Sequence, residues 1–435
     1  MKLENALPAE RLALLRLIAS ESEASDVALY IVGGFVRDLI LETPSADFDF
    51  VVEGDAIALG ESLASQFGGQ VSSHRRFGTA KWQLDPQNEN LKSALQLEPS
   101  KLPETVDFVS ARTESYSHPT ALPSVKEGSI KLDLHRRDFS INTLALRLDG
   151  YNYGQLLDPW GGGKDIRDKQ IRVLHPLSFV DDPTRMLRAV RLEQRLGFTI
   201  ESRTLELLGR ALPLLDDVSG ERIRSEILAI LKEPRFGSIM LRLKELGVLQ
   251  AIYPALDWDD WIEARTFAAR DFSPPASWKL ERMPTLSELF YALWLYRLSA
   301  GEAGEVCERL HLSQSEAVVV MKAGRQTCDL AQYRPPSEWA ACLDAEPEAA
   351  LLVTWLALKD QAAARQIIEN YLKHWRWVQP TVDGDRLHEL GLAPGPAFGR
   401  ILRALRAAWL DGEISSAQEE QHMLAILLRE EAEGG

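Results

Sequence analysis

The chain has 435 residues, 45% of them hydrophobic, and carries a formal net charge of −15. This length exceeds one ordinary hydrophobic core, so we expect about two to four domains. The composition is that of a soluble globular protein, and no uninterrupted apolar stretch reaches about 18 residues, so we expect no membrane span. The acidic balance argues against non-specific nucleic-acid binding and predicts no DNA partner.

The charge is unevenly distributed along the chain. Residues 131–226 contain 16 Lys and Arg against 15 Asp and Glu, a net of +1, so the rest carries −15 − 1 = −16. The middle of the chain is therefore where we expect RNA to bind. The N-terminus lacks a signal-peptide pattern, and Cys307, Cys328 and Cys342 lack Cys-x-x-Cys spacing. These features predict buried thiols in a cytoplasmic protein.

In chain order, residues 1 to about 25 predict an amphipathic helix, and residues 28–148 predict mixed strands and helices. The segment 84–106 is polar and contains prolines, so we expect an extended surface loop. From Asp181 onward apolar residues recur three and four apart, which predicts helices. The fold class is thus α+β in front and all-α behind. The predicted strands are 28–33, 47–53, 79–84, 106–112 and 142–149, and the predicted helices include 35–41 and 55–67.

A glycine turn followed by two aspartates is the most informative local pattern. Gly33 and Gly34 end the first predicted strand, and their backbone N–H groups, with the helix start that follows, suit a triphosphate. Arg37 on that helix is placed to pair with the same phosphates. Asp47 and Asp49 alternate with phenylalanines on the next strand, so both carboxylates share one face about 7 Å apart. Such a pair can hold two divalent cations for nucleotidyl transfer, whereas an isolated Asp-x-Asp is more often a solvated edge or a helix cap.

Asp107 is the candidate for a third catalytic carboxylate. It lies on the predicted strand 106–112, which we expect beside the strand that carries the two aspartates. A third carboxylate would complete a two-metal site. The alternative is a strand residue that simply faces solvent.

The segment from His135 to Asn142 is the second pattern with chemical content. Arg136 and Arg137 offer planar donor groups for phosphates. Asp138 and Asn142 are four residues apart and are predicted to reach a ribose hydroxyl from one helical face. An Arg-Arg-Asp run is usually surface charge, but the apolar residues that follow predict that this segment packs into a core.

Asp182 and Arg185 form the most discriminating pair. Asp182 is predicted to cap a helix that begins at Pro183, which places the two side chains on one face of its first turn. The carboxylate accepts and the guanidinium donates, which matches cytosine and adenine but not uracil or guanine. The alternative is a capped helix with an intrahelical ion pair. The same spacing continues with further candidate nucleotide or RNA contacts at Arg188, Arg191 and Arg195, and Glu221 and Arg222 are expected to brace the pocket.

Taken together, these segments resemble the class II tRNA nucleotidyltransferases (the CCA-adding enzymes) and the bacterial poly(A) polymerases. The resemblance covers most of the chain and is weakest between about 255 and 375. One departure is Asp181, where the family usually has Glu. The matching segments are Gly33-Gly-Phe-Val-Arg-Asp38, Asp47-Phe-Asp49, Arg136-Arg-Asp-Phe-Ser-Ile-Asn142, Asp158-Pro-Trp-Gly-Gly162, Asp181-Asp-Pro-Thr-Arg185, Ser219-Gly-Glu-Arg-Ile223, Leu390-Gly-Leu-Ala-Pro-Gly-Pro396 and Asp411-Gly-Glu413.

The resemblance implies a polymerase β-like nucleotidyltransferase head, followed by helical neck, body and tail. It implies Mg²⁺ at Asp47 and Asp49, and a protein template for the incoming base at Asp182 and Arg185. CTP and ATP would be the substrates, and tRNA would contact the head and neck through its acceptor stem and the tail through its elbow. The implied boundaries are 1–150 for the head, 151–232 for the neck, 233–375 for the body and 376–435 for the tail.

The resulting expectation is template-independent addition of CMP, CMP and AMP to the 3′ end of tRNA, with release of pyrophosphate. The alternatives within the family are a CC-adding enzyme, an A-adding enzyme and a poly(A) polymerase. A non-catalytic RNA-binding protein would be expected to lose the metal carboxylates, and both are present.

Overall fold

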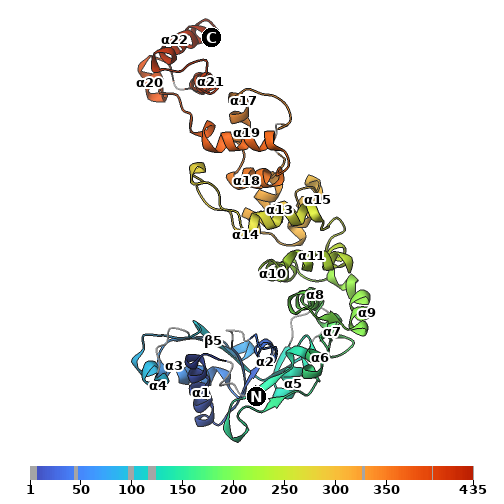
Figure 1. Cartoon of the computed structure of the whole chain (residues 1–435). Helices are drawn as coiled ribbons and strands as arrows, with labels where there is room; N and C mark the ends of the chain where they lie inside the picture. Colours follow the sequence, from blue (N-terminus) through green and yellow to red (C-terminus); the bar gives the residue numbers. More distant parts are fainter. Residues whose placement is uncertain are drawn as a thin grey trace. The chain divides into compact units, whose positions relative to one another are not determined.

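The computed structural model describes residues 7–43, 48–96, 102–115, 124–325, 329–393 and 395–434. The chain forms two compact units, Met1–Ile252 and Tyr253–Gly435. The first combines a mixed sheet with helices and the described part of the second is helical (Figure 1). The predicted α+β class with a helical second part is therefore confirmed.

The first unit is built on a seven-stranded sheet in the order β3-β4-β5-β2-β1-β8-β9. Strand β1 pairs antiparallel with β2 and β8, and β2 pairs parallel with β5. The β6–β7 hairpin and the β10–β11 pair lie outside this sheet. The strands are β1 (Ala28–Val32), β2 (Asp49–Glu53), β3 (Gln70–His74), β4 (Thr79–Gln83), β5 (Thr105–Ser110), β6 (Arg112–Ser115), β7 (Ser124–Glu127), β8 (Ala145–Arg147), β9 (Leu156–Leu157), β10 (Gln170–Ile171) and β11 (Thr199–Ile200).

The two faces of the sheet are covered by different helices. On one face α3 (Ala56–Phe67) lies so close that a Cβ on Gly60 would be 3.3 Å from Ala80 Cβ. Helix α1 (Ala9–Ala24) packs against α3 (Figure 1). On the other face Leu134 of α5 (Ile130–His135) packs on Tyr30 and Val51. Because α5 reaches only part of this face, Asp49 stays exposed there.

Several element boundaries differ from the sequence prediction. The segment predicted as a loop over 84–106 contains the helix α4 (Glu89–Leu95), because Asn88 caps it and Leu91 and Leu95 are buried. Strand β3 and the β6–β7 hairpin were not predicted. The predicted strand 142–149 is shorter, since Asn142 belongs to a 3-10 turn, Ser140–Asn142.

Helices make up most of the first unit outside the sheets. Gly162 of α6 (Gly162–Arg167) touches the 3-10 turn closely, because a Cβ there would lie 2.3 Å from the Ser140 carbonyl oxygen. This contact ties the glycine-rich segment to the motif at residues 136–142. The other helices are α2 (Gly34–Ile40), α7 (Ser178–Asp181), α8 (Arg185–Leu196), α9 (Ser202–Ala211), α10 (Gly220–Leu231), α11 (Phe236–Glu245) and α12 (Val248–Ile252).

The second unit is built of packed helices. Capping boxes begin α14, α15 and α16 at Thr285, Ser299 and Ser313. A separate apolar cluster near the C-terminus includes Leu387 and Leu405. The helices are α13 (Asp260–Arg270), α14 (Leu286–Trp294), α15 (Ala300–Arg309), α16 (Gln314–Lys322), α17 (Pro336–Leu343), α18 (Glu348–Ala357), α19 (Ala362–Lys373), α20 (Gly384–Glu389), α21 (Pro396–Asp411) and α22 (Ala417–Gly434).

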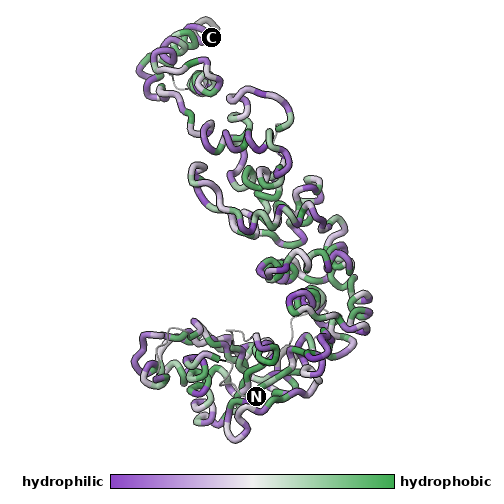
Figure 2. Tube along the Cα trace, in the orientation of Figure 1, coloured by the Kyte–Doolittle hydropathy of each residue, from purple (hydrophilic) through white to green (hydrophobic). Residues whose placement is uncertain are grey.

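Hydrophobic and hydrophilic residues alternate along the helices of both units (Figure 2). Within the residues that the structure describes, no helix is both long and apolar enough to cross a membrane. The prediction that every cysteine is a thiol is wrong, because Cys342 is disulfide-bonded, whereas Cys307 is free and buried.

Candidate active site

The glycine turn at the end of β1 brings two distant motifs together. Gly33 has φ +69°, a conformation that residues with a Cβ rarely adopt. A Cβ at this position would also lie 2.9 Å from Arg137 Nη1. The Gly33 N–H donates to the Leu144 carbonyl oxygen at 3.0 Å. Glycine at this turn therefore leaves room for a guanidinium over the backbone, next to the start of α2 at Gly34.

Two candidate catalytic carboxylates lie side by side on the sheet. Asp49 on β2 is the register partner of Asp107 on β5, so both side chains share a face. Asp49 is exposed and the Asp107 side chain is 45% exposed. Asp47, the other predicted ligand, lies outside the described residues. We call Asp49 and Asp107 the carboxylate row.

The carboxylate row fits a hard divalent cation such as Mg²⁺, because that ion takes oxygen ligands and keeps several waters. Among the described residues, no group of three acidic, His or Cys side chains is placed to hold a metal. The sequence prediction adds Asp47 to these two carboxylates.

A chain of hydrogen bonds links the helix after the glycine turn to the second motif. Arg37 is buried, and its Nη1 donates to Asn142 Oδ1 at 2.7 Å while its Nε donates to Asp38 at 2.7 Å. Asn142 Nδ2 in turn donates to Asp138 Oδ1 at 2.9 Å. Asp138 and Asn142 meet through a turn and not on one helical face, because Phe139 between them is extended. That part of the prediction is wrong.

Arg136 and Arg137 are held by a carboxylate that the sequence did not single out. Asp133 is fully buried, and its two oxygens accept from Arg136 Nη2 at 2.7 Å and Arg137 Nη2 at 3.0 Å. The signal was present as a three- and four-residue spacing, which places Asp133 below both arginines at the end of α5. The two guanidiniums are thus fixed in place by one buried charge.

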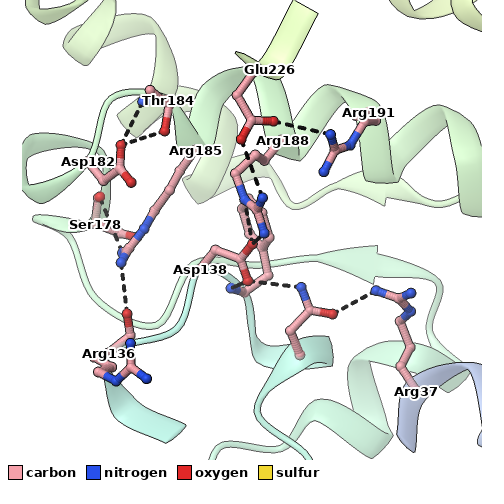
Figure 3. Close-up of polar contacts among 12 residues, drawn as sticks. Arg37, Arg136, Asp138, Ser178, Asp182, Thr184, Arg185, Arg188, Arg191 and Glu226 are labelled. Atoms are coloured by element: carbon pink, nitrogen blue, oxygen red, sulfur yellow. Dashed lines mark hydrogen bonds and ion pairs between the residues drawn. The ribbon is translucent and has the colours of Figure 1, made fainter. Parts of the chain in front are cut away.

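Asp182 and Arg185 do not form the predicted pair on one helical turn. Helix α8 begins at Arg185, two residues later than expected, and Asp182 is extended, with φ −145°. Asp182 Oδ1 accepts from Arg222 Nη2 at 2.7 Å. Arg185 is buried and donates to Ser178 Oγ at 2.7 Å and to the Arg136 carbonyl oxygen at 2.8 Å (Figure 3). Arg222 therefore supports the pocket as expected, and it does so by its contact with Asp182.

Arg188 and Arg191 are bridged by Glu226 from α10. Arg188 contacts Asp138 at 2.7 Å and Glu226 at 3.4 Å, and Arg191 contacts Glu226 at 3.2 Å (Figure 3). Burial opposes ionisation of Asp138, but the charge of Arg188 and the hydrogen bonds from Asn142 and Arg188 outweigh it and lower the pKa of the carboxyl. The charge of Asp138 raises the pKa of Arg188. Sequence reasoning missed Glu226, because nothing in its local sequence marks the contact.

These side chains line one pocket of about 450 Å³, which we call the arginine pocket. It gathers every predicted nucleotide-binding residue together with Asp49. The remaining lining residues are Leu192 and Arg195. The lining residues that the sequence predicted as catalytic or nucleotide-binding are Gly33, Gly34, Arg37, Asp49, Arg136, Arg137, Asp138, Asn142, Asp182, Arg185, Arg188 and Arg191.

Comparison with known proteins agrees with this geometry. Residues 29–172 match the family described as "Poly A polymerase head domain", and residues 197–259 match "Probable RNA and SrmB- binding site of polymerase A". The chain is 34% identical to the A-adding tRNA nucleotidyltransferase of Geobacter sulfurreducens over 98% of its own length and 48% of that relative. It is 31% identical to the A-adding tRNA nucleotidyltransferase of Halalkalibacterium halodurans, over 96% of the chain and 92% of that relative.

The chain belongs to the tRNA nucleotidyltransferase and poly(A) polymerase family. A solved structure, "The structure of CCA-adding enzyme apo form II", is 28% identical with a TM-score of 0.77, and the match covers 98% of this chain and 97% of that one. The resemblance drawn from the motifs is thus confirmed, and so is the assignment as a nucleotidyltransferase enzyme. The chain spans about half the length of the A-adding Geobacter relative. Some of the relatives are named A-adding enzymes and others are named CC-adding enzymes.

Proposed function

We propose that this nucleotidyltransferase adds the terminal AMP of the CCA sequence to tRNA, using ATP and releasing pyrophosphate. The observation that carries the transfer chemistry is the arginine pocket, in which the glycine turn, Asp49 and a set of anchored guanidiniums line one space of about 450 Å³. The cationic side chains suit a triphosphate, and Asp49 adjoins the place where its α-phosphate would react.

The residues of the pocket have separate roles in this proposal. The backbone at Gly33 and Gly34 binds the phosphates, with Arg137 over the turn. Asp182 and Arg185 read the base, and Arg222 and Ser178 hold them in position. Asp49 and Asp107, with Asp47, would hold Mg²⁺, which supplies charge stabilisation to the attacking and leaving oxygens.

In the transfer itself, the 3′-hydroxyl oxygen of the tRNA forms a bond to the α-phosphorus of the nucleotide. The bond from that phosphorus to the bridging oxygen breaks, pyrophosphate leaves and the hydroxyl proton passes to solvent. No side-chain base is required in this proposal. The protein contributes position and electrostatic complementarity, which are the main sources of catalysis in phosphoryl transfer.

The curated relatives favour A addition, because the first three of them carry that name and are 31–40% identical to the chain. Complete CCA addition is the second candidate. It is the function expected from the motifs, and it is favoured by the CCA-adding enzyme structure that matches nearly the whole chain. An acceptor at Asp182 and a donor at Arg185 would be compatible with both, since cytosine and adenine present the same donor and acceptor order.

The deciding experiment uses tRNA transcripts that end before CCA, after C and after CC. Each is incubated with the purified protein, Mg²⁺ and labelled ATP, CTP or UTP separately, and then with ATP and CTP together. Incorporation of A only on the transcript ending in CC is the expected result. Completion from the shortest transcript would establish CCA addition instead, and arrest after CC would establish a CC-adding enzyme. Long A tails would indicate a poly(A) polymerase, and no incorporation at all would overturn the proposal.

A further inference from the structure

A lysine with no role in the reaction described so far lies beside the carboxylate row. Lys81 on β4 is the register partner of Asp107 on β5, which is itself the register partner of Asp49 on β2. Register partners on neighbouring strands point to the same face of a sheet. Lys81, Asp107 and Asp49 therefore follow one another across three adjacent strands on one face.

The opposite face of these strands is covered, which leaves this face for substrates. A Cβ on Gly60 of α3 would lie 3.3 Å from Ala80 and 3.9 Å from Phe108, the neighbours of Lys81 and Asp107 in the sequence. Lys81 Nζ lies 3.2 Å from Asp107 Oδ1, with 51% and 45% of the two side chains exposed. An ion pair this exposed contributes little to stability, so a structural role alone explains little of its placement.

The order of the strands separates two sides of the carboxylate row. The arginine pocket includes Gly33 and Asp49 but neither Asp107 nor Lys81, so it lies on the β1 side of Asp49. The strand order β4-β5-β2-β1 puts Lys81 on the other side. A reaction that joins two substrates at the carboxylates needs the nucleotide on one side and the acceptor on the other.

We propose that Lys81 binds the terminal phosphodiester of the acceptor RNA and so positions its 3′ hydroxyl at the carboxylate row. An ammonium on a flexible stem is a point charge suited to phosphate. Neighbouring strands are about 4.8 Å apart, so Lys81 stands roughly 10 Å from Asp49 across the sheet, beside the nucleotide whose hydroxyl reacts. The ion pair with Asp107 keeps the ammonium in place before RNA binds. The inference rests on the proposed function, because it takes RNA as the acceptor.

The test measures RNA binding directly, without turnover. Fluorescence anisotropy with a labelled tRNA that ends in a 3′-deoxynucleotide is compared for the wild type, Lys81→Met, Lys81→Arg and Lys92→Met over a series of salt concentrations. Lys92 is the matched control, because it forms an exposed ion pair with Glu89 on α4, outside the site. A second RNA carries a neutral methylphosphonate at its last linkage.

We expect Lys81→Met to raise the Kd about three- to tenfold and to reduce the salt slope by about 0.7, the value for one phosphate contact on a single strand. The Lys81→Arg variant should retain most of the affinity, and Lys92→Met should match the wild type. The methylphosphonate should weaken binding to the wild type but not to Lys81→Met, because the two changes remove the same contact.

Equal Kd and salt slope for the wild type and Lys81→Met would overturn the inference. So would equal sensitivity of both proteins to the methylphosphonate, since the lysine would then contact another group. A different result would overturn the proposed function: the wild type would bind RNA in a way that depends on Lys81, yet it would incorporate no nucleotide. In that case the phosphate contact stands and the chemistry assigned to the carboxylate row does not.

Discussion

The carboxylate row and the arginine pocket adjoin each other, yet they neutralise their charges differently. Asp107 lies half-exposed, with the equally exposed Lys81 as its ion-pair partner. In the pocket, Arg188 shares Asp138 with Asn142 and shares Glu226 with Arg191. Asp107 is thus held by strand register and one exposed ion pair, whereas each of these arginines is held by a carboxylate from another segment.

This difference follows from what each region must bind. Carboxylates that take a hydrated cation need open space and only modest support, because the ion brings its own waters. Arginines that read a base or a phosphate must be fixed in direction, and a buried or half-buried carboxylate fixes a guanidinium through two parallel contacts. The comparison therefore predicts that changes in the carboxylate row reduce activity without unfolding the protein, whereas changes among the arginines anchored by Asp138 and Glu226, or in those two carboxylates, do both.

The largest effect is expected at Asp49. Asp49→Asn should reduce incorporation by at least about 10³-fold, since it removes a charge at the point of transfer, while tRNA binding and thermal stability stay nearly unchanged. Single-turnover incorporation and melting temperature are the measurements. Asp168→Asn is the control, because Asp168 forms only an exposed ion pair with Lys164. Turnover by Asp49→Asn near the wild-type rate would contradict the role of the carboxylate row.

Asp138 should show the opposite pattern, with a loss of stability. Asp138→Asn leaves Arg188 with Glu226 as its remaining partner at 3.4 Å. Breaking a buried pair costs several kcal/mol, but Arg188 is 36% exposed, so we expect about 1–3 kcal/mol. Urea unfolding at neutral pH measures the loss.

The pH dependence of unfolding shows whether the charge of Asp138 stabilises the fold. The pKa of Asp138 is lower in the folded protein than its ordinary value near 3.9, so the contribution is present above about pH 4. It is lost as the pH falls through the folded pKa. The wild type and Asp138→Asn should therefore differ most at neutral pH and converge as the pH falls through the folded pKa of Asp138. A constant difference across that range would mean that the Asp138 charge does not stabilise the fold.

The sequence predicted the parts of this site that depend on local rules. Strand alternation placed Asp49 on the face opposite the phenylalanines, and the prediction that Asp107 lies on the neighbouring strand is confirmed by their register. The glycine turn also follows from local backbone freedom, since Gly33 needs a positive φ. Such features are set by neighbours in the chain or by the two-residue period of a strand.

The ion pairs were harder to predict because partners come from distant segments. The sequence paired Asp182 with Arg185, but tertiary packing gives Asp182 to Arg222 and gives Arg185 to Ser178. Glu226 lies 38 residues from Arg188 and has no motif of its own. The residues of the pocket were therefore predictable as a set, whereas the contacts among them required the fold.

Arg185 tests whether anchoring serves selectivity. Arg185→Ala should relax the preference for ATP or CTP over UTP by about tenfold, because one donor to the base is lost, a discrimination of about 1–3 kcal/mol. Competition between labelled nucleotides measures the change. Arg222→Met should relax the preference in the same direction but by less, since Asp182 loses its ion pair with Arg222 and keeps its hydrogen bonds from Thr184. Unchanged selectivity in both variants would mean that Asp182 and Arg185 only maintain the fold.

The smallest effect is expected at Arg195, where the pocket opens to solvent. Its side chain is 45% exposed, and its contacts with Asp38 and Glu233 are long, at 3.7 and 3.9 Å. A guanidinium held this loosely remains available to an RNA phosphate, so Arg195→Met should weaken tRNA binding about two- to threefold and lower the salt slope by less than about one. The free energy of unfolding should stay within about 0.5 kcal/mol of the wild type. Loss of stability comparable to that of Asp138→Asn would place Arg195 among the anchored arginines and would move the boundary of the anchored region outward to the end of α8.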